Sequence, residues 1–326
     1  MARSIIYTNG VIAAKDKYLL KDKILRFCEL SAEEAFRMLI ESGFGGGAET
    51  AENVYEYEKL IEAEERAVDE FILEYAPSKE EQAYLLSPRD FHNAKAILKA
   101  TYLKTDAEKM LAPQGEIAIE KLVAYIQNGD FSALEKEYPE LKKACEDGLA
   151  SLQEEEVSGA ELSEIFEKAA YAYATRICKK NSTLRHLLQT KADMTNILIA
   201  FRAKEEQKAK NKYLPGGTLD EATLSKLFLD GEKAEEAFKY SVYRAFVRLC
   251  LEAKQKGLPF TAAEKIRDGY ETEYFQQRRY DLKHAQPFLY YVFRRRTENA
   301  NVRIVFVCLL AGLKEAEVKK RLRAAF

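Results

Sequence analysis

The sequence is poor in the residues that interrupt regular structure. Its 326 residues include only 7 prolines and 15 glycines, and tryptophan is absent. Apolar residues make up 47% and charged residues 32% of the chain, a balance that excludes a disordered protein. With few breakers and abundant Ala, Glu, Lys and Leu, the composition predicts a mostly helical protein. A chain of this length buries a large core without needing disulfides or metals.

Neither disulfides nor a metal centre is indicated. No Cys-x-x-Cys or His-Glu-x-x-His pattern occurs, and the three histidines lie about 95 residues apart. An odd number of widely spaced cysteines predicts free thiols in a reducing compartment. The residues concerned are Cys28, Cys145, Cys178, Cys250 and Cys308, with His92, His186 and His284.

Long apolar runs are also missing. The longest uninterrupted one, Ile304 to Leu313, has ten residues. A membrane-spanning helix needs about twenty. We therefore predict that the chain does not cross a membrane by itself.

The motifs of common enzyme classes are absent. The glycine-rich segment 43–47 lacks the Gly-Lys-Ser/Thr of a phosphate-binding loop, and Glu49 follows it, which opposes phosphate binding. No nucleophile elbow or dinucleotide-binding fingerprint occurs. Carboxylate clusters such as Glu154–Glu156 lie in charged stretches expected to face solvent. We predict no catalytic residue and no bound cofactor.

Charge is distributed unevenly along a nearly neutral chain. The net charge is −2, which argues against nucleic acid as a partner. Residues 29–81 include 16 acidic and 4 basic side chains, net −12, whereas residues 278–326 include 12 basic and 4 acidic ones, net +8. Either the two ends meet different neighbours, or these charges belong to helix faces balanced by contacts within the fold.

Helical signals run through the chain. Ser31 and Glu34 form a capping box, Gly43 suits a left-handed helix end, and the glycines of 45–47 predict a flexible turn. Only Ile5–Val11 resembles an extended segment. Ser87 and Asp90, with Pro88 at the favoured first position, predict a further helix start. Other helices are expected at 51–75, 116–127, 131–147, 160–180, 184–211, 219–229, 232–256, 261–277 and 284–313.

An acid-x-x-Asn pattern occurs three times at nearly equal spacing. The two intervals between its asparagines are 103 and 105 residues. Apolar residues stand four and eight positions beyond each acid, which puts a polar pair before an apolar stripe on one helix face. Pro-Gly corners follow the first two copies but not the third, where Arg295 replaces the Ser or Thr of the others. The pairs are Asp90 and Asn93, Asp193 and Asn196, and Glu298 and Asn301.

This spacing predicts three related helical units around a pseudo-threefold axis, with the polar pairs near one end of it. The units cover about residues 5–112, 113–215 and 216–326 of a single all-helical body. The alternative is three independent helix starts, where Asp and Asn are common in any case.

Aromatic and basic residues gather between Tyr270 and Arg296. Tyr and Arg are the residues that protein interfaces favour. They also suit nucleic acid, but the overall negative charge opposes that interpretation. The alternative is a core helix with a basic end at its solvent side, and the sequence leaves interface and core helix both open.

Several segments together resemble the C subunit of the bacterial and archaeal V/A-type ATPases, whose eukaryotic counterpart is the d subunit. They are Tyr7–Val11 followed by Leu19-Leu20, the three acid–asparagine pairs, Leu214–Gly217, and Thr297–Arg303 with Gly312-Leu313. The resemblance covers essentially the whole chain, and its most specific part is the Glu-x-x-Asn-Val-Arg segment.

The resemblance implies an all-α, funnel-like body of three similar units. It implies a non-catalytic central-stalk subunit that couples the rotor shaft subunits to the membrane proteolipid ring, for ATP-linked transport of H⁺ or Na⁺. The stator membrane subunit is a further possible partner, and the implied location is peripheral, on the cytoplasmic side of the membrane.

For contacts with shaft or ring we expect six arginines, and we expect the motif acids Asp90, Asp193 and Glu298 to order the inner end of the funnel. Two alternatives remain: a helical adaptor unrelated to any ATPase, and a helical enzyme with a carboxylate site in a deep pocket. The six arginines are Arg278, Arg279, Arg294, Arg295, Arg296 and Arg303.

Overall fold

A computed structural model describes residues 4–15, 20, 23–152, 159–281 and 284–323, and all regular structure among them is helical. The predicted all-α class is therefore confirmed. The chain divides into two compact units, unit 1 with residues 1–79 and 268–326, and unit 2 with residues 80–267. The division into repeats at 5–112, 113–215 and 216–326 stays a prediction.

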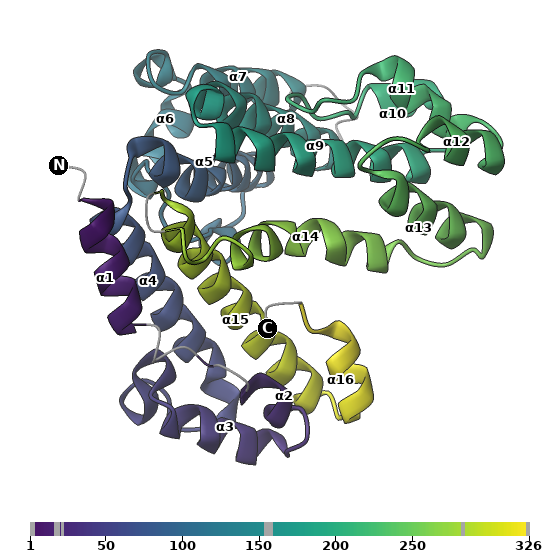
Figure 1. Cartoon of the computed structure of the whole chain (residues 1–326). Coiled ribbons are helices and arrows are strands. Elements are labelled where there is room, and N and C mark those ends of the chain that lie inside the picture. Colours follow the sequence, from purple (N-terminus) through teal and green to yellow (C-terminus); the bar gives the residue numbers. More distant parts are fainter. Residues whose placement is uncertain (1–3, 16–19, 21–22, 153–158, 282–283, 324–326) are drawn as a thin grey trace. The chain divides into compact units, whose positions relative to one another are not determined.

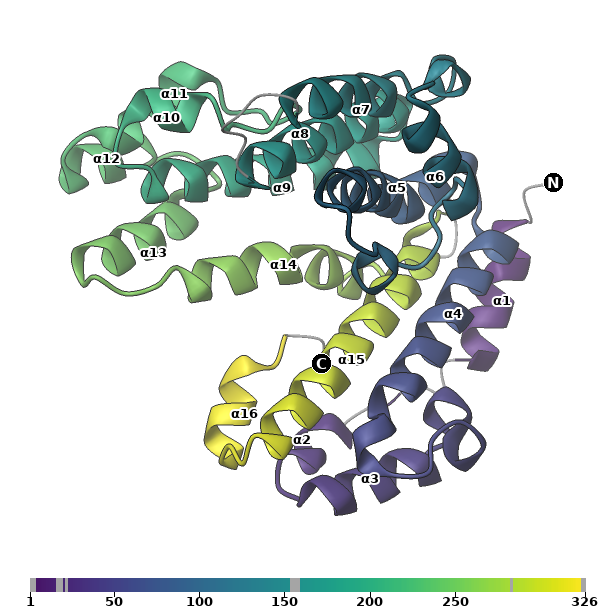
Figure 2. The same cartoon turned by 180° about the vertical axis from the view of Figure 1, so that it is seen from behind.

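Unit 1 combines helices from both ends of the sequence. Helices α4 and α15 lie side by side, and α1 packs on α15 (Figures 1 and 2). Short 3-10 helices at Phe44–Glu49 and Val54–Glu56 precede α4. The helices of this unit are α1 (Ile5–Lys15), α2 (Lys23–Phe27), α3 (Ala32–Glu41), α4 (Tyr57–Tyr75), α15 (Gln286–Leu310) and α16 (Glu315–Arg321).

Unit 2 is built around α7, α8 and α9, where α8 packs on both of the others (Figure 1). Helix α5 begins at the boundary between the units, and α14 crosses it. Their bounds and those of the other helices are α5 (Lys79–Leu103), α6 (Ile119–Asn128), α7 (Pro139–Leu152), α8 (Gly159–Ile177), α9 (Ser182–Arg202), α10 (Glu206–Lys210), α11 (Glu221–Ser225), α12 (Gly231–Ala237), α13 (Arg244–Gln255) and α14 (Thr261–Gln276).

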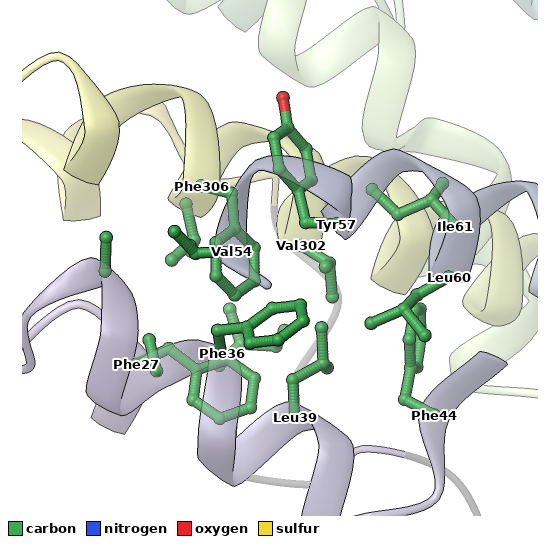
Figure 3. Packing of buried hydrophobic residues seen from close by; sticks show 14 of the residues in the cluster. Phe27, Phe36, Leu39, Phe44, Val54, Tyr57, Leu60, Ile61, Val302 and Phe306 are labelled. Atoms are coloured by element: carbon green, nitrogen blue, oxygen red, sulfur yellow. The ribbon is translucent and has the colours of Figure 1, made fainter. Parts of the chain in front are cut away.

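The core of unit 1 joins the two ends of the chain. Tyr57 of α4 stacks on Phe306 of α15 with ring centroids 5.2 Å apart, and Phe36 of α3 meets Phe306 edge-on (Figure 3). Leu39 and Val302 are fully buried in the same cluster. Burial of these side chains drives association of α3, α4 and α15, at about 25 cal/mol per Å² of apolar surface.

The N-terminal segment is a helix, so the extended structure predicted for Ile5–Val11 is wrong. Thr8 is fully buried, and its hydroxyl donates to the backbone carbonyl of Tyr75 at 3.2 Å. The ring of Tyr7 stacks on that of Tyr75. These contacts within unit 1 override the β-propensity of a segment rich in branched side chains.

Local signals around α3 are confirmed. The Ser31 hydroxyl accepts the Glu34 amide, and the Glu34 carboxylate accepts the Ser31 amide at 3.0 Å. Gly43 follows the helix with φ +73°. The turn at 45–47 is packed, because the Gly45 amide donates to Glu64 of α4 and a Cβ at Gly45 would overlap the Leu60 backbone.

The three acid–asparagine pairs lie inside long helices and do not begin them. Asp90 is the twelfth residue of α5, which passes through Pro88 without ending. Asp193 and Glu298 likewise lie well inside α9 and α15. The predicted helix start at Ser87 is wrong, because burial of the flanking apolar residues compensates for the backbone hydrogen bond that proline cannot make.

Several predicted helices are interrupted. The segment 131–147 is a 3-10 turn at Ser132–Leu134 followed by α7, which begins only at Pro139, and the segment 219–229 is α11 followed by a 3-10 turn. The segment 232–256 divides into α12 and α13, because a turn between them lets both Phe238 and Tyr243 enter the core. The segment 184–211 divides into α9 and α10, after which the chain returns to α9. The reason for that return lies in the polar pair on α9.

Candidate functional site

The first polar pair binds the loop that follows α5. The Ala112 amide donates to Asn93 Oδ1 at 2.8 Å, and Asn93 Nδ2 donates to the Ala112 carbonyl at 3.2 Å. The amides of Glu116 and Ile117 each donate to Asp90 at 3.0 Å. Asp90 and Asn93 are both fully buried, so the pair satisfies loop backbone groups that burial would otherwise leave unpaired. We call such an arrangement a clasp.

The second pair makes the same clasp 103 residues later in the chain. Leu214 donates its amide to Asn196 Oδ1 at 2.7 Å and accepts Asn196 Nδ2 at its carbonyl at 3.0 Å. Asp193 accepts the amides of Thr218 and Leu219 at 2.8 and 3.0 Å. It also accepts the hydroxyls of Thr218, at 2.5 Å, and of Tyr243, at 2.8 Å. This clasp explains why the chain returns to α9.

A glycine lets each of these two loops approach its aspartate. A Cβ at Gly115 would overlap the Asp90 carboxylate, and a Cβ at Gly217 would overlap that of Asp193. Both glycines belong to the Pro-Gly corners noted in the sequence. Glycine is thus required at both positions because the loop backbone approaches a buried carboxylate closely.

The third pair uses both ends of the chain. Asn301 binds the backbone of Arg323, accepting its amide at 2.8 Å and donating to its carbonyl at 3.1 Å. The backbone amide of Leu20, near the other terminus, hydrogen-bonds Glu298. The asparagine half of the clasp is therefore kept, while the N-terminal segment supplies the backbone donor for the acid.

At Glu298 two arginines take the place of the loop amides that bind Asp90 and Asp193. Arg294 Nε lies 3.3 Å from Glu298 Oε1, and Arg295 Nη1 lies 3.6 Å from Oε2. Arg295 also forms an ion pair with Glu64 of α4. Burial raises the pKa of Glu298 and lowers that of Arg295, because both charges lie away from water. Arg295 stands where the other copies have Ser87 and Thr190.

Among the described residues, no cation forms an ion pair with Asp90 as Arg294 and Arg295 do with Glu298. Burial raises its pKa to about 7, although the amides of Glu116 and Ile117 oppose this shift by stabilising the charged form. The nearby carboxylate of Glu116 adds to the increase, and Arg89 opposes it. The first and third clasps thus hold buried acids by different electrostatic means.

The six arginines proposed as partner contacts do not form one surface patch. Arg294 and Arg295 are buried in the network just described, with exposed fractions of 8 and 7%. Arg303 is half-buried and pairs with Glu58 at 3.0 Å and Glu65 at 3.3 Å. The first two guanidinium groups are therefore occupied inside unit 1 and are unsuited to direct partner contacts.

The other predicted contacts are more accessible. Arg278 lies over the ring of Tyr274, with its guanidinium carbon 3.9 Å from the ring centroid, and Arg279 lies over Tyr280 at 4.6 Å. Tyr280 is 79% exposed. Arg296 is partly buried. These arginines and Arg303 remain candidates for partner contacts.

The acidic and basic ends of the sequence pair with each other. Arg295 and Arg303 of α15 bind glutamates of α4, and Lys319 of α16 pairs with Glu29 at 3.0 Å. The charge asymmetry thus serves contacts within the fold, the second of the two interpretations that it allowed. Sequence reasoning missed Glu58, Glu64 and Glu65, although the excess of acid in that segment was their signal.

A large groove in unit 2 does not resemble a carboxylate active site. It has a volume of about 680 Å³ and lies between α7, α8 and the second clasp loop. Lys143, Lys168 and Lys210 line the groove together with its acidic residues. The two acids with raised pKa values, Asp90 and Glu298, do not line it. Within the described residues, no cluster of His, Cys, Asp and Glu could hold a metal ion.

What the clasps can do is mechanical. Each one fixes a loop or a chain end to the middle of a long helix through buried hydrogen bonds. Of the helices in the described residues, none combines the length and apolar character needed to span a bilayer.

Comparison with known proteins agrees with the resemblance seen in the sequence. No curated protein matches the chain significantly. A family model described as ATP synthase (C/AC39) subunit matches residues 8–321. This range includes all three clasps except Arg323, whose backbone Asn301 binds. The chain therefore belongs to the C/AC39 subunit family of the V/A-type ATP synthases.

Proposed function

We propose that this chain is the non-catalytic central-stalk subunit that couples the rotor shaft of a V/A-type ATPase to its membrane proteolipid ring. The observation that carries the proposal is the family match over nearly the whole chain. In this role the subunit acts as a socket, which transmits torque between ATP hydrolysis or synthesis and transport of H⁺ or Na⁺.

The construction of the chain supports such a role, because a torque coupler must be stiff. The clasps join loops to helices at Asn93, Asn196 and Asn301. A largely buried ion pair, Arg295 with Glu64, and a half-exposed one, Arg303 with Glu58, join α15 to α4 inside unit 1. The asparagine–backbone bonds of the clasps resist deformation, since breaking one leaves unpaired groups in a medium of low dielectric constant.

The proposal includes the partners and the location. The partners are the shaft subunits and the proteolipid ring, with the stator membrane subunit as a further neighbour, and the location is the cytoplasmic face of the membrane. Arg278, Arg279, Arg296 and Arg303 are the side chains we propose for these contacts. The chain is proposed to have no catalytic activity of its own.

The test is purification of the tagged chain from gently solubilised membranes, followed by mass spectrometry of the proteins that copurify. We expect ATPase shaft subunits and proteolipid, and their loss when the membrane complex is stripped apart. Recovery of the chain without either would contradict the proposal and favour an adaptor unrelated to the ATPase.

A further inference from the structure

A small groove lies in unit 1 between the second half of α15 and the end of α16. Its volume is about 370 Å³. The apolar part consists of Ala300, Ile304 and Val307, which follow each other at helical spacing on α15. Val307 is 52% exposed, which is unusual for an aliphatic side chain on a helix that is otherwise so deeply buried. Ile304 packs partly against the core of unit 1, and Val307 lies at the open side of the groove.

The rim of the groove is basic. Arg303, Arg321 and Arg323 line it. Arg321 donates to the sulfur of Cys308 at 3.6 Å, and neither Arg321 nor Arg323 forms an ion pair with a carboxylate among the described residues. By contrast, the neighbouring lysines of α16 are each paired with a glutamate. Two guanidinium groups therefore lack an ion-pair partner beside an apolar floor.

The third clasp holds one of these arginines in place. Asn301 binds only the backbone of Arg323, so the clasp itself does not require an arginine side chain. The residues bound in the same way in the other two copies are Ala112 and Leu214. A charged side chain at this position thus distinguishes the third copy, and it lines a groove that suits a negative partner.

We propose that this groove binds an acidic segment of a partner protein. The segment places an apolar side chain on Ala300, Ile304 and Val307, and its carboxylates meet Arg321 and Arg323. An amphipathic helix with acids beside an apolar stripe has this chemistry. The inference rests on the proposed function, because the partner it implies is another subunit of the same ATPase.

A protein segment fits the groove better than an anionic lipid surface. Recognition of such a surface requires a cluster of about four to eight available cations. Here Lys319 is neutralised by Glu29 and Glu315, and Lys320 by Glu317. Three arginines line the groove, and one of them, Arg303, is paired with Glu58 and Glu65, so the groove offers fewer available cations than an anionic surface requires.

Photocrosslinking in the assembled complex tests the proposal. Benzoylphenylalanine at position 307 is expected to crosslink, in native membranes, to a protein segment rich in Asp and Glu. Position 73 on α4 is the control, because Leu73 is exposed to a similar degree, 57%, and lies outside the groove. Irradiation there should not capture the same segment.

Charge reversal makes the test specific. The double change Arg321→Glu and Arg323→Glu should reduce the crosslink yield from position 307 about tenfold, since like charges replace opposite ones. Lys320→Glu, on the same helix but outside the groove, should leave the yield unchanged. Circular dichroism and thermal melting of each variant check that it folds.

Several outcomes would overturn the inference. They are crosslinks from position 307 to lipid only, to this chain only or to nothing, and a yield that the double reversal does not change. If shaft and ring subunits copurify while position 307 captures no acidic segment, the groove inference fails and the proposed function stands. If an acidic segment is captured but no ATPase subunit copurifies, the proposed function fails instead.

Discussion

The carboxamide of Asn196 pairs with both backbone polar groups of Leu214, donating to its carbonyl at 3.0 Å and accepting its amide at 2.7 Å. The two residues are 18 positions apart, and both are buried. The side chain thus replaces the backbone partner that a sheet or helix would supply. The same relationship joins Asn93 to Ala112 and Asn301 to Arg323.

Removing this carboxamide should be costly. Asn196→Ala leaves the amide and carbonyl of Leu214 buried without partners, so we expect it to lower the free energy of unfolding by about 2–4 kcal/mol. Urea denaturation followed by circular dichroism measures the change. Asn128→Ala, at the exposed end of α6, is the control and should change stability by no more than about 0.5 kcal/mol. Equal effects of the two changes would contradict a clasp.

The glycine against the second clasp should not tolerate a methyl group. Gly217→Ala places a Cβ inside the Asp193 carboxylate, and overpacking of this kind costs about 1–3 kcal/mol. Gly269 lies within α14, and a Cβ there meets nothing within 4 Å. Gly269→Ala should therefore stabilise the protein by about 0.5–1 kcal/mol. Thermal melting of both variants gives the signs, and a stabilising Gly217→Ala would refute the close approach.

The buried ion pairs of α15 should depend on both partners. Arg295→Met leaves Glu64 without its cation and Glu298 with Arg294 alone, and we expect a loss of about 3–5 kcal/mol in the free energy of unfolding. Arg248→Met, in an exposed pair with Glu252, should cost less than about 1 kcal/mol. Addition of Glu298→Gln to Arg295→Met should recover part of the loss, and a strictly additive double variant would argue against coupling.

The carboxyl of Asp90 should titrate near neutral pH. Its pKa is about 7 in the folded protein, against an ordinary value of 3.8. Because the folded state holds this proton more tightly, the contribution to stability is complete below pH ~4 and is lost as the pH rises through 7. Carbon-13 NMR of the carboxyl carbon, assigned by its absence in Asp90→Asn, measures the midpoint. A midpoint near the ordinary value would show that the backbone donors outweigh burial.

The cysteines should be unreactive until the protein unfolds. All five are buried free thiols, and burial raises the pKa of Cys145, Cys178 and Cys250 to about 12. The thiolate is the reactive form. An aromatic disulfide reagent at mildly alkaline pH should therefore label the native protein slowly and all five thiols after denaturation. Rapid labelling of the native protein would indicate local opening.

The helices could be predicted from the sequence because they form from local signals. The capping box at Ser31 and Glu34 forms as predicted, since both partners lie within one turn. The helix start placed at Ser87 and Asp90 was wrong, because Asp and Asn in a helix interior have the same sequence signature as a cap. Only their loop partners, 18 to 27 residues away, distinguish the two.

Part of the candidate site could be predicted from the sequence. The spacing of the three pairs identified the residues that bind loops, because each pair keeps its place on a long helix. The arginine contacts were only partly predictable, since Glu298 lies within one turn of Arg294 and Arg295, whereas only packing brings Glu64 to Arg295. A sequence shows that a cation is present and does not show which carboxylate reaches it.

The sequence by itself determined the helical class and the three polar pairs, because periodicity, composition and spacing are properties of the chain alone, and the resemblance of its segments indicated the family. The tertiary structure decided what those pairs do and which charges face solvent. It brought Leu20 and Arg323 to the third pair and α4 to the arginines of α15. It also brought Lys319 to Glu29, 290 positions away. Such partners are selected by the burial of a shared core, which no local pattern encodes.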